Sequence, residues 1–454
     1  MARGEIGVEE TLAQFVLGLR WDGIPSDVKR ISRLALLDVT ICVRAGIKTE
    51  VGKRFDWGLA AWAGDGPCTV AGGGSHRAAV AAAWSNSLAA HVLDFDDNHD
   101  VLGGHLSAVM MPAGVAAAEV TGDVTLDELL LAYVGASEAT CKVARTLGRG
   151  AYASGWHPTS LLGVIGAALI SGRLMRLSED ELVQALGLAA GLASGVKANF
   201  GTPAKSIQVG HAAGMGVLSA QLAGMGIAGS RRGLSAAQGL GGVLTQNAAS
   251  WDVLGRLGRA WDLLDPGLVF KLYPCCASTH AALEAAGALS RRHDGVLASE
   301  IREIRVEMAA PRVPHVDRPM PTDAQEARFS VQYVVARAWL AGLCRLEDFS
   351  SERLADPEVL AVMSRVRVVG MPCPPWEWSA ARVLANVAGE IDQEEVPVAT
   401  GHGRRRPVTE DDLVAKARSV GEKEGVCQEL RQLAGSEAGQ LSDLVTLWAG
   451  RDPG

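Results

Sequence analysis

Hydrophobic positions follow a helical period through about residue 265 of the chain. Leu12, Phe15 and Leu19 have the i, i+3, i+7 spacing that places apolar side chains on one face of a helix. Alanine-rich runs such as "AAVAAAWSNSLAAHVLD" and "LLGVIGAALISG" continue the same helical pattern. The pattern predicts helices packed on helices in this part of the chain.

The pattern changes after Pro266–Gly267, a turn signal that marks a candidate domain boundary. In "EIREIRVEM", Ile304, Val306 and Met308 alternate with charged residues, which is the period of a half-buried strand. "RVRVV" and "ARVLANVAGEI" alternate in the same way, with helical segments between them. We therefore expect a smaller α+β domain in this region.

Near its end the chain becomes helical again. Thr409 is followed by three acidic residues, which is typical of a capping box at the start of a helix. We expect this tail to return to the first domain. The predicted fold is mainly α, with a large all-helical domain formed by residues 1–267 and 401–454 and a smaller α+β lid domain over 268–400.

One segment could be mistaken for a membrane span. From Ser206 to Ser230 the chain has no charged residue, which is long enough for the ~20 residues that a bilayer requires. However, six of its positions are glycine, and Gln208, His211 and Gln221 interrupt it. Small residues at four-residue spacing favour close helix packing, so we expect a buried helix and no membrane association.

Composition and charge narrow the class of protein. A chain of 454 residues should form two or more packed units. Its formal net charge of −8 offers no general attraction to nucleic acid. The first residues, "MARGEIGVEETLAQF", lack the basic start and apolar run of an export signal, and the eight cysteines form no C-x-x-C pair. We expect a cytoplasmic protein with free thiols.

The most concentrated chemistry lies in "HVLDFDDNHD", where His91–Asp100 holds four acids and two histidines. It could be a metal site, an acid/base centre, or a solvated helix end whose acids cap the next turn. On a helix, Asp96, Asp97 and Asp100 would share one face, and D-D-x-x-D resembles the magnesium–diphosphate motif of helical isoprenoid synthases. The helical region has no second motif of that kind, and aromatic residues make up only 5% of the chain.

Three further basic residues each stand at a turn that opens a helical pattern. His105 follows two glycines in "GGHLSAV", His157 precedes Pro158 in "GWHPTS", and Lys205 follows a proline in "TPAKSIQ". A single histidine is more often structural than catalytic. Several such residues at turns indicate loop-borne groups that converge on a pocket.

Five stretches of the sequence together resemble the MmgE/PrpD family. They are "HVLDFDDNHDVLGGHLSAVMMPAGVAAAE", "GWHPTSLLGVIGAA", "GTPAKSIQVGHAAGMGVLSAQLAGMGIAG", "KLYPCCASTHAALEAA" and "FSVQYVVARAWLAG". This family includes dehydratases, decarboxylases and epimerases of small polycarboxylates. The resemblance implies a helical domain with an α+β lid, a homodimer, and chemistry that needs neither a metal nor an organic cofactor.

The resemblance also implies a set of site residues. The expected catalytic residues are Asp94, His105, His157, Lys205 and Tyr333, and the expected substrate-binding residues are Lys271, Asn98, Gln208 and Cys276. Lysines stabilise negative charge strongly in a dry pocket, so Lys205 and Lys271 are expected to anchor carboxylates. Histidine titrates near neutral pH, so His105 and His157 are expected to act as acid and base. Asp94 would orient a neighbouring group.

Departures from the family pattern bear on the substrate. Asn98 stands where threonine is common, Gln208 where histidine is common, and Cys276 where the decarboxylase branch has a pocket histidine. We therefore expect a cofactor-independent lyase acting on a small di- or tricarboxylate, and a hydro-lyase similar to 2-methylcitrate dehydratase, in which Tyr333 donates to the leaving hydroxyl. The alternatives are an epimerase or decarboxylase of a related polycarboxylate, and a non-catalytic dimeric ligand-binding homologue.

Overall fold

The computed structural model describes residues 6–73, 75–372, 379–435 and 439–450. Their contacts divide the chain into two compact units. Of the described residues, the first unit holds those up to Asn199, those of Ala204–Phe270 and those from Thr409 onward, and the second unit holds those of Phe200–Pro203 and Lys271–Val408. The role of the second unit as a lid stays a prediction.

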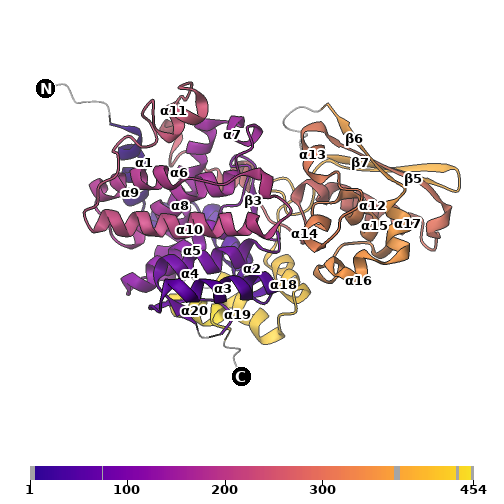
Figure 1. Ribbon diagram of the computed structural model, residues 1–454, viewed down its shortest axis with the longest axis horizontal. Coiled ribbons are helices and arrows are strands. Elements are labelled where there is room, and N and C mark those ends of the chain that lie inside the picture. The colour runs from indigo at the N-terminus through magenta and orange to yellow at the C-terminus, as the bar shows by residue number, and fades with distance from the viewer. Residues whose placement is uncertain (1–5, 74, 373–378, 436–438, 451–454) are drawn as a thin grey trace. The chain divides into compact units, whose positions relative to one another are not determined.

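Long helices form the first unit (Figure 1). The helices at its centre are α2 (Ser26–Ile47), α4 (Ala79–His91), α5 (Ser107–Thr121), α6 (Leu126–Leu147) and α8 (Pro158–Leu174). Helix α4 packs against α2 and α5, and α8 packs against α5 and α6. Almost every residue of α5 and α8 is buried, as expected for helices that are apolar on all sides. The mainly helical prediction is confirmed.

The first unit also contains other helices. They are α1 (Val8–Gly18), α3 (Glu50–Ala63), α7 (Gly150–Ala153), α9 (Glu179–Leu192), α10 (Pro203–Gly224), α11 (Leu240–Thr245), α18 (Glu410–Ser419), α19 (Glu424–Gly435) and α20 (Leu441–Trp448). The last three pack against α2. The capping box that begins α18 is confirmed, because the Thr409 hydroxyl accepts from the backbone N–H of Asp412 at 3.2 Å.

Helix α10 is the uncharged segment that resembled a membrane span. A Cβ at Gly210 would lie 2.4 Å from the Trp84 ring, and one at Gly216 would lie 2.3 Å from the Cβ of Ala167. The glycines therefore let α10 approach α4 and α8 closely, which is the reason for the unusual composition. Within the ranges that the structure describes, no helix has the length and apolar character needed to cross a membrane.

The prediction of an all-helical first domain is wrong in detail. The first unit contains β1 (Cys68–Thr69), paired antiparallel with β2 (His76–Arg77), and β3 (Asn98–His99), paired antiparallel with β4 (Leu268–Val269). Each strand has only two residues, which is too short to produce an alternating pattern in the sequence. The β3–β4 pair nevertheless connects the acidic stretch to the end of the helical region.

The second unit contains a four-stranded mixed sheet in the order β6-β5-β7-β8. Its strands are β5 (Ile301–Ala309), β6 (Val366–Met371), β7 (Ala381–Val387) and β8 (Glu390–Val396). Strand β5 runs parallel to β6 and antiparallel to β7. Alternate residues of β7 are buried, as the sequence predicts. Strand β8 was not predicted because "EIDQEEV" carries few apolar residues; Ala388 and Gly389, both with positive φ, form its hairpin turn.

Helices α12 (His280–Arg292) and α15 (Val331–Ala341) pack against each other within the second unit, and α12 also contacts β7 and β8. The shorter helices are α13 (Val313–Val316), α14 (Ala324–Ala327), α16 (Ser351–Leu354) and α17 (Pro357–Met363). The seven cysteines within the described residues are free thiols, as predicted. The prediction for Cys373 lies outside the described residues.

Candidate active site

The acidic stretch is neither helical nor solvated. Helix α4 ends at His91, and residues 94–97, here called the aspartate loop, lead from it to β3. Asp94 is 4% exposed and Asp96 and Asp97 are fully buried. The helix-end interpretation and the shared helical face for Asp96, Asp97 and Asp100 are therefore wrong. A loop at this point was not visible in the sequence, because its conformation depends on Asp94, whose φ of 51° is left-handed.

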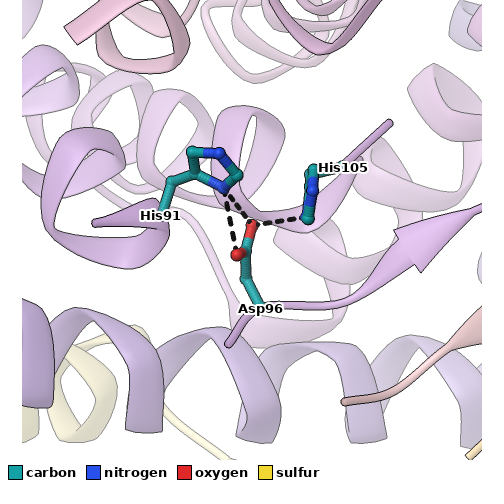
Figure 2. Close-up of side chains that lie close together, drawn as sticks. All are labelled: His91, Asp96 and His105. Atoms are coloured by element: carbon teal, nitrogen blue, oxygen red, sulfur yellow. Dashed lines mark hydrogen bonds and ion pairs between the residues drawn. The ribbon is translucent and has the colours of Figure 1, made fainter. Parts of the chain in front are cut away.

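Asp96 lies between two imidazoles (Figure 2). Its two carboxylate oxygens lie 2.9 and 3.0 Å from Nδ1 of His91. One of these oxygens is also 2.9 Å from Nδ1 of His105. Burial by itself would raise the pKa of Asp96, but His105 and His91 hold this pKa well below its usual value. Asp96 is therefore an anion shared by both rings.

His91 is neutral at pH 7. Burial lowers its pKa to about 4, against the opposing effect of Asp96. With Nδ1–H donating to Asp96, the lone pair is on Nε2, which is the usual arrangement of a carboxylate-oriented imidazole. His91 and Asp96 were missed as site residues. Their presence in one short acidic stretch was a signal, but the sequence does not show that a loop folds them onto each other.

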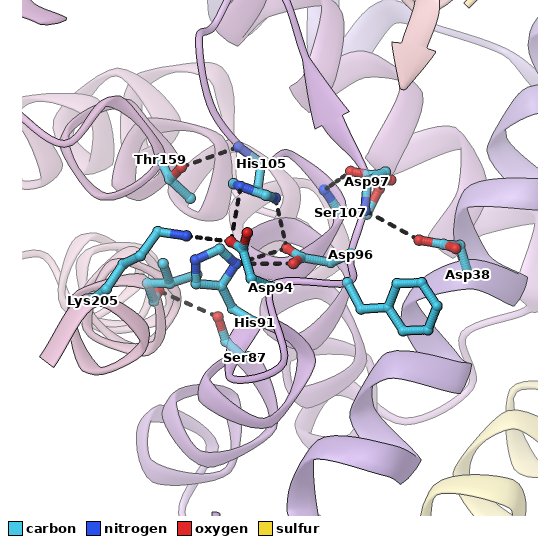
Figure 3. A network of polar contacts seen from close by, with 12 residues as sticks. Asp38, Ser87, His91, Asp94, Asp96, Asp97, His105, Ser107, Thr159 and Lys205 are labelled. Atoms are coloured by element: carbon cyan, nitrogen blue, oxygen red, sulfur yellow. Dashed lines mark hydrogen bonds and ion pairs between the residues drawn. The ribbon is translucent and has the colours of Figure 1, made fainter. Parts of the chain in front are cut away.

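Lys205 forms an ion pair with Asp94, and both side chains are at least nine-tenths buried. The same oxygen of Asp94 is 4.0 Å from Nε2 of His105. His105 therefore faces Asp96 through one nitrogen and Asp94 through the other (Figure 3). We call His91, Asp94, Asp96, His105 and Lys205 the His–Asp cluster. The structure brings three predicted catalytic residues together in it.

The position of His105 depends on a close approach of two backbone segments. The backbone N–H of His105 donates to the hydroxyl of Thr159 at 3.1 Å. A Cβ at Gly104 would lie 2.5 Å from the same hydroxyl oxygen. Gly103 has a φ of 66°, which is unfavourable for other residues. The two glycines before His105 therefore allow this turn to pack against the start of α8.

His157 extends the site from the neighbouring helix. It precedes α8, and its ring centroid is 6.3 Å from that of His91. Its Nδ1 lies 2.9 Å from the side-chain oxygen of Gln208. Burial and then the charge of Lys205 lower the pKa of His157 well below its usual value. Gln208 follows Lys205 by three residues on α10, so both side chains share a helix face.

Asn98 is half-buried in β3, one residue after the aspartate loop. Its neighbour His99 is fully buried, and Nε2 of His99 lies 2.9 Å from the carbonyl oxygen of Asp262. This contact connects β3 to the segment before β4, so His99 has a structural role. A direct role for Asn98 in substrate binding stays a prediction.

The remaining predicted residues belong to the second unit. Tyr333 is buried in the core of that unit, and its hydroxyl donates to the carbonyl oxygen of Asp348. Lys271 is 1% exposed. Cys276 is half-buried, and its backbone N–H donates to the carbonyl of Arg328 at 2.9 Å. Their expected roles in catalysis and binding stay predictions.

The cluster also has the composition of a metal site. His91, Asp96 and His105 each offer one ligand atom, and these atoms lie within 4.8 Å of one another. Two imidazoles and one carboxylate can bind a divalent transition metal. In the structure, the carboxylate of Asp96 lies 2.9 Å from Nδ1 of each of the two imidazoles. Activity without a metal stays a prediction.

The sequence matches known family domains over most of its length. Residues 10–251 match the MmgE/PrpD N-terminal domain, and residues 273–434 match the MmgE/PrpD C-terminal domain. The first match contains the whole His–Asp cluster. The second contains Cys276 and Tyr333.

Curated relatives are similar over most of both chains. A cis-aconitate decarboxylase of Aspergillus terreus (strain NIH 2624 / FGSC A1156) is 28% identical over 79% of this chain and 78% of its own. The cis-aconitate decarboxylases of Mus musculus and Homo sapiens are each 27% identical over 92% of this chain, and over 87% and 88% of their own lengths. Together with the two domain matches, which cover far more than half of the chain, this similarity confirms the resemblance read from the motifs: the protein belongs to the MmgE/PrpD family.

Proposed function

We propose that the protein is a cofactor-independent lyase that acts on a small di- or tricarboxylate. The reaction would move a proton at a carbon atom next to a carboxylate. The observation that carries this proposal is the placement of His105, whose Nδ1 is 2.9 Å from Asp96 and whose Nε2 is 4.0 Å from Asp94, the partner of Lys205. An oriented imidazole beside a buried cation is suited to this chemistry.

Each member of the cluster has a separate task in this proposal. Asp96 fixes Nδ1 of His105, so Nε2 is the nitrogen that exchanges a proton with the substrate. Lys205 stabilises the negative charge that develops on the substrate carboxylate when the adjacent carbon becomes a carbanion. Asp94 holds the ammonium group in place before the substrate binds. No step in this scheme requires an electron acceptor or a hydride carrier.

His157 is the second proton-transfer group. It is uncharged at neutral pH, because burial and Lys205 depress its pKa. Gln208 accepts from Nδ1–H in the arrangement that leaves Nε2 as the basic nitrogen. A neutral imidazole in this position can accept a proton, whereas an imidazolium could not. We therefore assign His157 as the base and His105 as the acid.

Two reactions fit this machinery. The curated relatives are cis-aconitate decarboxylases, and their similarity favours loss of carbon dioxide from a cis-aconitate-like tricarboxylate. Cys276 favours dehydration, because the decarboxylase branch has a histidine at that position. We rank decarboxylation first, because it is supported by similarity over most of the chain and the dehydration argument rests on one residue.

We also propose a homodimer, which light scattering would test.

The direct test is proton NMR in deuterated buffer with chelator-treated protein. 2-Methylcitrate, citrate, cis-aconitate and iminodisuccinate are offered separately. We expect cis-aconitate to lose carbon dioxide and gain one deuteron. Formation of a new alkene from 2-methylcitrate or citrate would support dehydration, and exchange with inversion of iminodisuccinate would support epimerisation. No turnover of any of the four would contradict the proposed function and favour a ligand-binding homologue.

Lys205→Met tests the central cation. The substitution preserves most of the side-chain volume but removes the charge, so kcat/KM should fall by roughly 10²–10³-fold. The matched control is Lys53→Met, because Lys53 is an exposed lysine on α3. Equal activity of the two variants would show that Lys205 does not contribute to turnover.

A further inference from the structure

Helix α18, in the C-terminal tail, places a lysine in contact with the aspartate loop. Lys416 is 3% exposed, and its ammonium group lies 2.6 Å from a carboxylate oxygen of Asp38 on α2. The same ammonium donates to the carbonyl oxygen of Phe95 at 2.6 Å and lies 4.0 Å from the centroid of the Phe95 ring. Lys416 therefore contacts both the backbone and the side chain of the residue between Asp94 and Asp96.

The loop that Lys416 contacts has an unfavourable conformation. The φ of 51° at Asp94 lies in the left-handed region, where a residue with a Cβ costs on the order of 1–2 kcal/mol. Such conformations persist when surrounding contacts impose them. The loop is also fixed by the backbone N–H of Asp97, which donates to the second oxygen of Asp38 at 3.1 Å (Figure 3). Asp38 and Lys416 thus act on adjacent parts of one short segment.

We propose that Lys416 is a positioning residue, which holds the aspartate loop in the conformation that directs Asp94 to Lys205 and Asp96 to the two imidazoles. Burying an ammonium group costs free energy of desolvation unless nearby acceptors compensate its charge. Packing α18 against α2 would need only an apolar side chain. The ammonium group of Lys416 also donates a hydrogen bond to the Phe95 carbonyl, and this bond connects the C-terminal tail to the aspartate loop.

A purely structural role is the alternative, because Lys416 also joins α18 to α2. The chain offers a matched control at the same junction. Arg44 on α2 is 4% exposed and lies 2.7 Å from Glu422, which follows α18 and is 8% exposed. This ion pair also joins the tail to α2, where Arg44 donates in addition to the carbonyl oxygen of Leu447 and Glu422 accepts from Lys48 at 2.9 Å. Lys416→Met takes away the ammonium group that contacts Asp38, and Glu422→Gln takes away the carboxylate charge that contacts Arg44.

The experiment compares Lys416→Met with Glu422→Gln in the full-length protein labelled with 15N-histidine. Variants His91→Gln and His105→Gln assign the imidazole signals. We expect both test variants to lower the thermal midpoint. Only Lys416→Met should shift the signals of His91 and His105, because only this variant releases Asp96. With cis-aconitate as substrate, its kcat should fall by roughly 10²-fold, while Glu422→Gln stays within about twofold.

The kcat measurement rests on the proposed function, but the histidine signals do not. If the wild-type protein has no turnover, the proposed function fails and the NMR comparison still decides the role of Lys416. Unshifted histidine signals in Lys416→Met, or equal shifts in both variants, would overturn the proposal. If Lys416→Met does not fold, Asp38→Asn combined with Lys416→Met removes the unpaired charge; this double variant should fold and should show histidine signals shifted from those of Asp38→Asn alone.

Discussion

The two sides of the aspartate loop hold adjacent carboxylates in opposite states. Asp96 and Asp97 are both fully buried. Asp96 faces His91 and His105, and its pKa is well below the usual value. Asp97 faces Asp38 and accepts from the hydroxyl of Ser107, and burial followed by Asp38 raises its pKa to about 8. Equal burial therefore produces an anion on one side and a neutral acid on the other.

The difference shows that the partners of a buried acid decide its role. Two imidazoles compensate the charge of Asp96, so it can orient catalytic groups at neutral pH. The negative charge of Asp38 raises the pKa of Asp97 further, and the Ser107 hydroxyl that contacts Asp97 lies 2.8 Å from the Tyr133 hydroxyl. Asp97 therefore has a structural role beside the site. The same substitution at the two positions should have different consequences.

Asp96→Asn should cause the largest loss of activity. Asparagine preserves the shape but is uncharged, and its one carbonyl oxygen is a weaker acceptor than the carboxylate, so the Nδ1–H form of the two imidazoles would be less stabilised. We expect kcat to fall by roughly 10²–10⁴-fold, the usual contribution of an oriented acid or base. Steady-state kinetics measure this effect. Asp97→Asn is the control and should keep kcat within about tenfold; an equal loss in both variants would remove the distinction between the two sides.

Asp97→Asn should instead change how stability depends on pH. In the wild-type protein Asp97 stays protonated in the folded state up to about pH 8, whereas it ionises near pH 4 when unfolded. The unfolded state then binds fewer protons, so this residue makes the free energy of unfolding decrease as pH rises through that window. Asp97→Asn removes the decrease. Its stability relative to wild type should therefore rise with pH by at most about 1.4 kcal/mol per unit.

Urea unfolding between pH 5 and pH 9 measures this difference. The relative gain of the variant should level off above about pH 8, where Asp97 is ionised in both states. Asp96→Asn serves as the comparison, because the pKa of Asp96 is shifted in the opposite direction. Parallel stability curves for wild type and Asp97→Asn would show that Asp97 is not held in its neutral form.

Gln208→Leu should have the smallest effect. It removes the acceptor for Nδ1–H of His157 but leaves the His–Asp cluster intact. One neutral hydrogen bond contributes about 1 kcal/mol, so kcat should fall by roughly fivefold. The kcat–pH profile is the measurement, and a control at Gln221, further along α10, should match wild type. A loss as large as that of Asp96→Asn would place the main acid/base centre at His157.

Short-range sequence patterns were sufficient to predict much of the fold. The helical period predicts the helices of the first unit, and alternation predicts β5, β6 and β7, because each pattern repeats over one element. The capping box at Thr409 needs only four consecutive residues. Strands β1–β4 and β8 have no such signal, because their sequences are too short or too polar to show an alternating pattern. These strands form through backbone pairing with a neighbouring strand.

The sequence by itself determined which chemical groups are present: histidines, lysines and acids at turns, in an order that resembles one family. The tertiary structure decided what each group does. Lys205 and Asp94 are 111 residues apart, and Lys416 and Asp38 are 378 residues apart. A carboxylate becomes an orienting anion or a neutral acid according to such distant partners, because burial removes the water that would otherwise make all aspartates alike.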